Sequence, residues 1–375
     1  SEQGKILERQ LAVAVHVTMH NRIELRRIQD GQLYEGDVIT EERVISASGE
    51  PYLFSFLEIE SRGSADQPLE VVAHDGEGAD GEPLVMDQTT LKLSGDSISL
   101  DLEIRAACLE LMATGKTTLS NKITIEQTIH GNGASFCLNN GAVLSGKEMN
   151  LTFTELIEIM AEAELTATGA IVLQVKEGNI AQLGGIIRAQ RLSATAERGN
   201  IVLSTMQAEE RANILAAGSI SQQGGLITAR ELEMRAGQNI SLKDLVIETL
   251  IRLKAEQGSI TQGDGTLLAE ELIAEAGEEI ILNKVALAQV SLEAGGLVQL
   301  REQDDLVVTY SRSNRFDLEI EQAGDVELRE VIARSGPLSA LIKAKTADGD
   351  LLVGLVDSEK ELELYINGKI VENSE

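Results

Sequence analysis

Small and apolar residues recur along the chain about every 40 residues, whereas the charged residues between them vary. Segment 218–242 reads GSISQQGGLITARELEMRAGQNISL, and segment 258–282 reads GSITQGDGTLLAEELIAEAGEEIIL. A third copy, with one extra residue, occupies 178–203. The stretches between the copies repeat the theme more weakly, so the unit is about 20 residues long. Such a period is typical of repeat proteins whose units stack on one another.

Within each copy the apolar residues alternate with polar ones, which predicts strands. Leu232, Met234 and Ala236 stand two apart, with Glu233 and Arg235 between them. Intrinsic propensity alone favours a helix for such Ala-, Leu- and Glu-rich segments. However, Met234 would lie off the helical face that Leu232 and Ala236 share. We therefore expect short strands that are separated by corners containing Gly or Asn.

A unit of about 20 residues with short strands and glycine corners predicts one coil of an all-β fold, the parallel β-helix or β-solenoid. Each coil would stack on the previous one at about the 4.8 Å inter-strand spacing. Inward residues would then repeat because each packs on its counterpart, and outward residues would vary because they meet water. Glycine would remain where a corner needs unusual backbone angles.

The repeated pattern G-x-I-x-Q, G-G-x-I-x-A-x-x-L and A-G-x-x-I-x-L resembles the repeats of filamentous haemagglutinin-type adhesins, which are exported by two-partner or related secretion. The resemblance covers 141–356 and extends back toward Leu91. It implies a right-handed β-helix, an extracellular or bacterial cell-surface location, and adhesive or filament-forming work. Two features depart from the family: 1–90 lacks a secretion-domain signature, and turns such as AGEEI (276–280) are rich in Glu instead of Asn.

Three regions are expected along the chain. Residues 1–85 form an N-terminal cap or irregular early coils, 86–356 form the β-helix repeats, and 357–375 form a C-terminal hairpin cap. The hairpin is predicted from ELELYINGKIVE (361–372), which alternates on both sides of Asn367-Gly368, a dipeptide that favours tight turns. Because the ends of a β-helix expose strand edges, this hairpin would cap the last coil or pair with another molecule.

Composition narrows the class of protein. Aromatic residues make up only 2% of the chain, and 34 glycines accompany a large stock of Ile, Leu, Val and Ala, which suits a narrow core. The formal net charge of −29 argues against nucleic acid and anionic membrane surfaces as partners. No apolar run is long enough for membrane insertion. The chain begins at Ser1 without a leader, so we expect any export signal to lie upstream or to have been removed.

Two motifs resemble nucleotide-binding sequences. ATGKTTLS (113–120) ends like a P-loop, but Glu110 stands where that loop needs glycine, and the spacing of the flanking apolar residues fits an ordinary coil corner. GEGADG (76–81) has dinucleotide-type glycine spacing, but Pro83 follows and no helix is expected there. We expect no cofactor at either motif.

Candidate metal ligands and thiols are sparse. The loop 75–82 resembles a single calcium-binding turn with donors Asp75, Glu77, Asp80 and Glu82, and we interpret it as a solvated acidic loop. His16 and His20 would share one strand face, but they lack the further ligands of a zinc site. Cys108 and Cys137 are too few for a disulfide scaffold, and free thiols are favoured over a pair. We assign no catalytic, cofactor-binding or metal-binding residue.

The expected function is that of an extracellular structural or adhesive module, not an enzyme, that self-associates into fibres or binds a host or matrix surface. One alternative is a polysaccharide-degrading β-helix enzyme, although aromatic residues are few and the pairs Glu209-Glu210 and Asp304-Asp305 resemble solvated faces or turns. A second alternative is a leucine-rich-repeat binding protein, suggested by A-x-x-L-x-[AM]. That family needs Asn in the following turn and contains helix.

Overall fold

In the computed structural model, β-strands are the only regular secondary structure among the described residues, and they are joined by turns and bends. These are strands within 13–73, then 84–334 apart from Leu102, 341–366 and 368–372; side chains are described within 90–320, 324–334, 349–366 and 368–372. None of these residues is helical, so the predicted all-β class is confirmed. The helix required by the leucine-rich-repeat alternative is absent from this part of the chain.

Two compact units divide the chain, 1–190 and 191–375, and strand β18 (Ile186–Ala196) contains the boundary. The strands of the first unit are β1 (Val13–Val15), β2 (Asn21–Gln29), β3 (Gln32–Tyr34), β4 (Val38–Ile39), β5 (Phe54–Ser61), β6 (Leu69–Ala73), β7 (Leu84–Gly95), β8 (Ile98–Asp101), β9 (Ile104–Ala113), β10 (Lys116–Leu119), β11 (Lys122–Ile125), β12 (Thr128–Leu138), β13 (Val143–Gly146), β14 (Glu148–Ile159), β15 (Glu164–Ala167), β16 (Ala170–Val175) and β17 (Asn179–Gln182).

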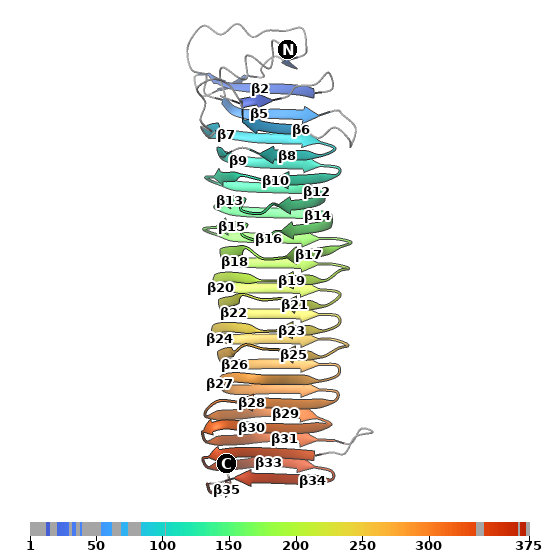
Figure 1. Ribbon diagram of the computed structural model, residues 1–375, viewed down its shortest axis with the longest axis vertical. Helices are drawn as coiled ribbons and strands as arrows, with labels where there is room; N and C mark the ends of the chain where they lie inside the picture. Colours follow the sequence, from blue (N-terminus) through green and yellow to red (C-terminus); the bar gives the residue numbers. More distant parts are fainter. Residues whose placement is uncertain are drawn as a thin grey trace. The chain divides into compact units, whose positions relative to one another are not determined.

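In the first unit the pairing changes from antiparallel to parallel along the chain. β1 pairs antiparallel with β6, and β2 pairs antiparallel with β3, β4 and β5. From the β5–β7 and β6–β8 pairs onward the strands described in this unit pair in parallel. Examples of register partners are Leu91 with Leu109, Leu109 with Ile129, and Ile129 with Met149. Each step advances the chain by about one 20-residue coil, as predicted, and the strands lie as successive rungs (Figure 1).

The second unit continues with alternating short and long strands. These are β19 (Ile201–Leu203), β20 (Thr205–Ala216), β21 (Ile220–Gln222), β22 (Leu226–Ala236), β23 (Ile240–Leu242), β24 (Asp244–Ala255), β25 (Ile260–Gln262), β26 (Leu267–Ala276), β27 (Ile280–Ala294), β28 (Leu297–Glu302), β29 (Leu306–Ser313), β30 (Arg315–Ala323), β31 (Val326–Ala333), β32 (Leu341–Asp348), β33 (Leu351–Ser358), β34 (Glu361–Ile366) and β35 (Ile370–Glu372).

Two parallel ladders run through the second unit. Ile220, Ile240, Ile260 and Ile280 are register partners along the short strands. The long strands β20, β22, β24, β26 and β27 form the other ladder. A register shift divides β20, β22 and β24 into two straight segments, for example between Gln207 and Arg211. The predicted stack of coils is therefore present within this unit.

Inward side chains fill the space inside each coil. Leu232, Met234 and Ala236 are no more than 1% exposed, whereas Glu233 and Arg235 reach solvent, as their alternation predicts. The largest fully buried side chains are three phenylalanines, and the rest of the core is mainly Ile, Leu, Val and Ala. Stacking like on like explains why the repeat preserves these positions: each removes its neighbour's apolar surface from water.

The C-terminal hairpin prediction is wrong in its pairing. β34 pairs in parallel with β32, and β35 pairs in parallel with β33. Gly368 therefore lies at a corner of a further coil, where a Cβ would lie 2.2 Å from the carbonyl oxygen of Gly349. The two strands predicted from the alternation are present, but a solenoid corner and a hairpin turn use the same turn residues.

Replacing one inward residue tests the stacked core. Leu272 is fully buried between Ile251 and Val290 of the adjacent rungs. We expect Leu272→Ala to destabilise the protein by about 2–5 kcal/mol, because it leaves a cavity. The outward neighbour substitution Ile273→Ala should cost about 0.5 kcal/mol or less. Thermal unfolding followed by circular dichroism compares them; equal shifts would contradict the assigned inward face.

Candidate functional site

The lateral surface of the second unit carries an open groove of about 490 Å³. It crosses the carboxyl ends of β24, β26, β27 and β29 and the corners that follow them. Its lining residues are Lys254, Ala255, Glu256, Glu275, Ala276, Gly277, Glu293, Ala294, Gly295, Arg312, Ser313, Asn314 and Arg334. No aromatic side chain is among them, so the groove lacks the stacking surface that a sugar-binding cleft commonly uses.

Close stacking of the backbone creates this hollow. A Cβ on Gly295 would lie 2.2 Å from the carbonyl oxygen of Gly277, so only glycine fits there. Two successive glycine corners leave the backbone uncovered beside the charged side chains of the preceding strand ends. The groove is therefore a by-product of the coil spacing that happens to gather charge along one margin.

Ion pairs between neighbouring coils line the groove margin. Lys254 contacts Glu275, and Arg312 lies 4.0 Å from Glu293 between guanidinium nitrogen and carboxylate oxygen. All four side chains are exposed, so each pair adds little to stability. The arrangement can recognise a partner with complementary charge, but within the described residues it shows no acid held in a dry pocket beside a base.

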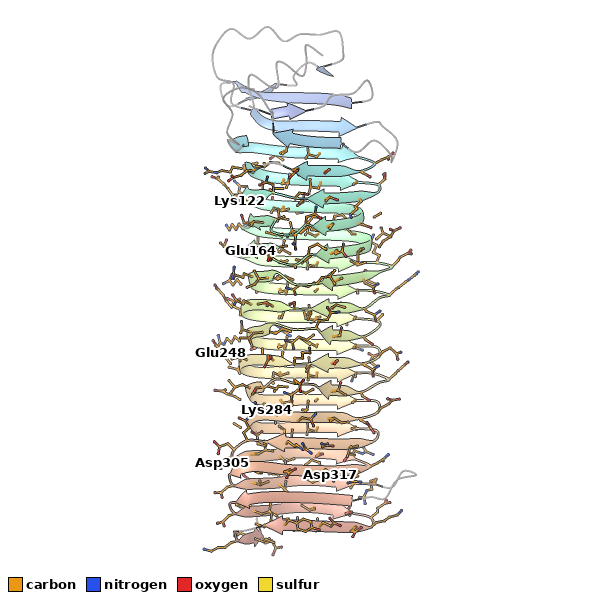
Figure 2. All side chains as sticks on the ribbon, viewed as in Figure 1. Lys122, Glu164, Glu248, Lys284, Asp305 and Asp317 are labelled. Carbon is orange, nitrogen blue, oxygen red and sulfur yellow. The ribbon has the colours of Figure 1, made fainter. Side chains whose placement is uncertain are left out.

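Aspartates at successive coils form a column at another corner of the same unit, away from the groove. The Oδ1 atoms of Asp305, Asp325 and Asp350 accept hydrogen bonds, each 2.7 Å long, from the backbone N–H groups of Asp325, Asp350 and Lys369 respectively. Figure 2 shows Asp305 at one margin of the coils. Asn200 and Asn239 make the same type of bond to the next coil in earlier repeats. The carboxylates thus replace asparagine as corner acceptors and add like charges.

Buried glutamines hold the opposite ends of the short strands. Gln222 donates from Nε2 to the carbonyl oxygens of Gly225 and Asp244, and its Oε1 accepts from the N–H of Lys243. Gln262 repeats these contacts with Gly265 and Lys284. Each amide therefore satisfies both its own polar atoms and the backbone of the bend, at 3% exposure.

Glu302 follows Gln262 by another 40 residues and is fully buried at the end of β28. Its carboxylate accepts from the N–H groups of Gln303, at 2.9 Å, and Leu287, at 3.2 Å. The pKa of Glu302 is raised from 4.5 to about 8, mainly by burial. The charge of Asp304 contributes to the rise, and the backbone hydrogen bonds offset part of it. Sequence reasoning missed this residue, although the 40-residue spacing from the glutamines was a signal.

The motifs singled out from the sequence have the following placement. Gly115 lies at the corner between β9 and β10, where its N–H donates to the carbonyl oxygen of Asp96, so a coil corner is confirmed there. The corner was expected to extend to Thr118, but β10 already begins at Lys116. Cys108 and Cys137 are both free thiols, the first half-buried and the second buried. The pairs Glu209-Glu210 and Asp304-Asp305 are exposed, as expected.

Other predicted features lie outside the described residues. These are His16, His20, the GEGADG motif (76–81) and the acidic loop of Asp75, Glu77, Asp80 and Glu82. In the described part of the chain, no group of three or more His, Cys, Asp or Glu side chains is placed to hold a metal ion. The described residues also contain no helix with the length and apolarity to cross a membrane.

The fold defines a class of protein, the β-solenoid repeat proteins. Comparison with protein-family models, curated proteins and solved structures gave no match to this chain. The repeat architecture and its outer surfaces are therefore the basis on which function is argued.

Glu302 predicts a distinctive dependence of stability on pH. Below about pH 4.5 its carboxyl is protonated in both folded and unfolded chains; between this pH and about 8 only the folded chain retains the proton. The stability contribution of the protonated group is therefore lost as pH rises toward 8. We expect Glu302→Gln to stabilise the protein by about 1–3 kcal/mol at about pH 9 and to change little at about pH 4. Thermal melts across pH test this, with the exposed Glu270→Gln as control; a benefit largest at acidic pH would contradict it.

The aspartate column predicts opposite effects for two substitutions. Asp325→Ala removes the acceptor for the Asp350 N–H and should cost about 0.5–1.5 kcal/mol. Asp325→Asn retains an acceptor and removes one like charge, so it should raise the melting temperature at low salt and lose this benefit at high salt. The converse Asn239→Asp is the matched control. An Asp325→Asn variant that melts like Asp325→Ala would show that the charge is needed.

Proposed function

We propose that the protein is an extracellular or cell-surface structural and adhesive module that works through its outer faces and coil edges. Side chains fill the interior of the described coils, so polar groups that can meet a partner lie on the outside. The resemblance of the repeats to filamentous haemagglutinin-type adhesins supports the location and the adhesive role. Self-association is the activity that the geometry supports best.

The observation that carries this proposal is the unpaired edge of strands β34 and β35 and the apolar side chain that it exposes. Each has one parallel partner among the described strands, β32 and β33 respectively, which leaves its other edge unpaired there. Ile370 is 56% exposed, whereas its register partner Leu351 is fully buried beneath it. A further strand stacked on β35 would cover Ile370 as β35 covers Leu351. Where the chain continues, its next coil would supply this cover; where this coil is the last one, we propose that an edge strand of another copy supplies it.

The polysaccharide-degrading alternative draws support from the lateral groove, where carboxylates lie beside cations on one face. Glycoside hydrolysis uses a pair of carboxyl groups, and the lining offers Glu256, Glu275 and Glu293, although these are exposed and aromatic residues are missing from the lining. Turnover of pectin-like or other acidic glycans that is lost in Glu275→Gln would establish this alternative in place of the structural role.

Association through the coil edge predicts sensitivity to one apolar side chain. We expect Ile370→Lys to abolish concentration-dependent assembly, because it places a charge where the next rung must pack. Leu268→Lys is the matched control, since Leu268 is 44% exposed on an outward strand face away from this edge. Sedimentation velocity and electron microscopy provide the readouts. Assembly that is equally strong in Ile370→Lys, or a wild-type protein that stays monomeric at all concentrations, would overturn the edge proposal.

A further inference from the structure

Four charged residues on adjacent rungs form what we call the charged column. Arg235, Lys254, Glu275 and Glu293 are successive register partners on β22, β24, β26 and β27. All four side chains point outward and are exposed. Read along the coils, the signs are plus, plus, minus, minus.

This order is poor for the stability of a single chain. Two of the three steps place like charges directly opposite each other, Arg235 beside Lys254 and Glu275 beside Glu293, which is unfavourable on a sheet. Only the central step, where Lys254 contacts Glu275, is complementary. Two contacts outside these four residues relieve part of the cost. Arg235 bonds Glu256 on the diagonal, and Arg312, the direct register partner of Glu293 on β29, approaches Glu293. An alternating order would serve one chain better.

The same order is complementary to its own reverse. A twofold axis that runs along the strand direction, between the rungs of Lys254 and Glu275, inverts the order of rungs in a second copy. Lys254 then faces the Glu275 position of the other copy, and Arg235 faces its Glu293 position. We propose that the lateral face carrying the charged column is an isologous docking surface for a second, antiparallel copy of this chain.

The neighbouring outward columns permit this pairing. The outward column two residues before the charged column contains Glu233, Arg252, Ile273 and Ser291. There the axis places Arg252 of one copy opposite Ile273 of the other, and Glu233 opposite Ser291. No two like charges meet in that column. In the next column the axis sets Leu250 against Glu271 and Glu231 against Gln289, again without a like-charge contact. The axis position set by the charged column thus brings no like charges together in these three columns.

The charge of this face also sets it apart from the chain as a whole. On the outward positions of the stretches 211–216, 231–236, 250–255, 271–276 and 289–294, four cations accompany five carboxylates: Arg211, Arg235, Arg252, Lys254, Glu231, Glu233, Glu271, Glu275 and Glu293. The complete chain has a net charge of −29. Because positive and negative charges are nearly balanced in these stretches, two copies can meet on this face with little net repulsion.

The dimer should be weak and sensitive to salt. Five rungs at about 4.8 Å and five residues of strand at about 3.3 Å give a patch of roughly 20 by 17 Å, which is smaller than a standard stable interface. Its attraction comes from exposed charges, which salt screens. This inference deepens the proposed structural role by adding side-by-side contact, whereas association through β35 is apolar and should persist in salt.

A mixing experiment distinguishes this geometry from other association. Arg235 and Glu293 are three rungs apart, about 14 Å, so they do not meet within one chain. In the Arg235→Glu variant, the new carboxylate at 235 of each copy faces Glu293 of the other copy. In the Glu293→Arg variant, the new cation at 293 of each copy faces Arg235 of the other copy. We expect each single variant to weaken dimerisation at least about tenfold. An equimolar mixture of the two should restore it, because every facing pair is then of opposite sign.

The measurement is sedimentation velocity of the full chain in the Ile370→Lys background, which removes edge association, at about 50 mM and about 500 mM salt. The double variant Arg235→Glu/Glu293→Arg should also dimerise, and circular dichroism confirms that each variant is folded. The proposal is overturned if the chain with its natural residues at 235 and 293 forms no salt-sensitive dimer. It is also overturned if the mixture of the two single variants associates no better than either variant alone. Such a failure would leave association through β35 intact.

Discussion

Hydrogen bonding between consecutive coils at the spacing of a single strand is the constraint on which each unit depends. Every parallel rung must place its N–H and C=O groups against those of the next, so the corner must return the chain to the same register after about 20 residues. That requirement explains the glycine at Gly295, where a side chain would meet the backbone of the preceding corner. It also explains why corner side chains such as Asn239 bond to the following coil.

Polar groups inside this arrangement must find partners at the bends, because the strand interiors are apolar. Gln222 and Gln262 meet this need with a neutral amide that both donates and accepts. Glu302 meets it with a carboxyl group that can only accept when ionised, at a fully buried position. The resulting rise in its pKa is the cost of desolvation, partly offset by the backbone donors around it.

Most of the coil architecture could be predicted from the sequence, because period-two alternation and stacking impose strong patterns. Leu232 and Leu272 fell on the inward face for this reason, and Met234 distinguished strand from helix. The pairing around Gly368 could not be read, since a hairpin and a solenoid corner use the same turn residues. The order of charges on the lateral face could not be predicted, because the repeat is defined by its apolar positions and outward positions such as Arg235 and Glu293 differ from one copy to the next.

The corner amides carry a consequence for how such a chain can lengthen. Gln222 is the register partner of Leu203, and Gln262 is the register partner of Leu242, so amide and aliphatic corners alternate from rung to rung. Insertion of a single coil would set two amides, or two aliphatic side chains, against each other and break the bonding at the bend. Duplication in steps of two coils preserves it. The unit by which this solenoid can be extended is thus a pair of coils, which matches the 40-residue period of its sequence.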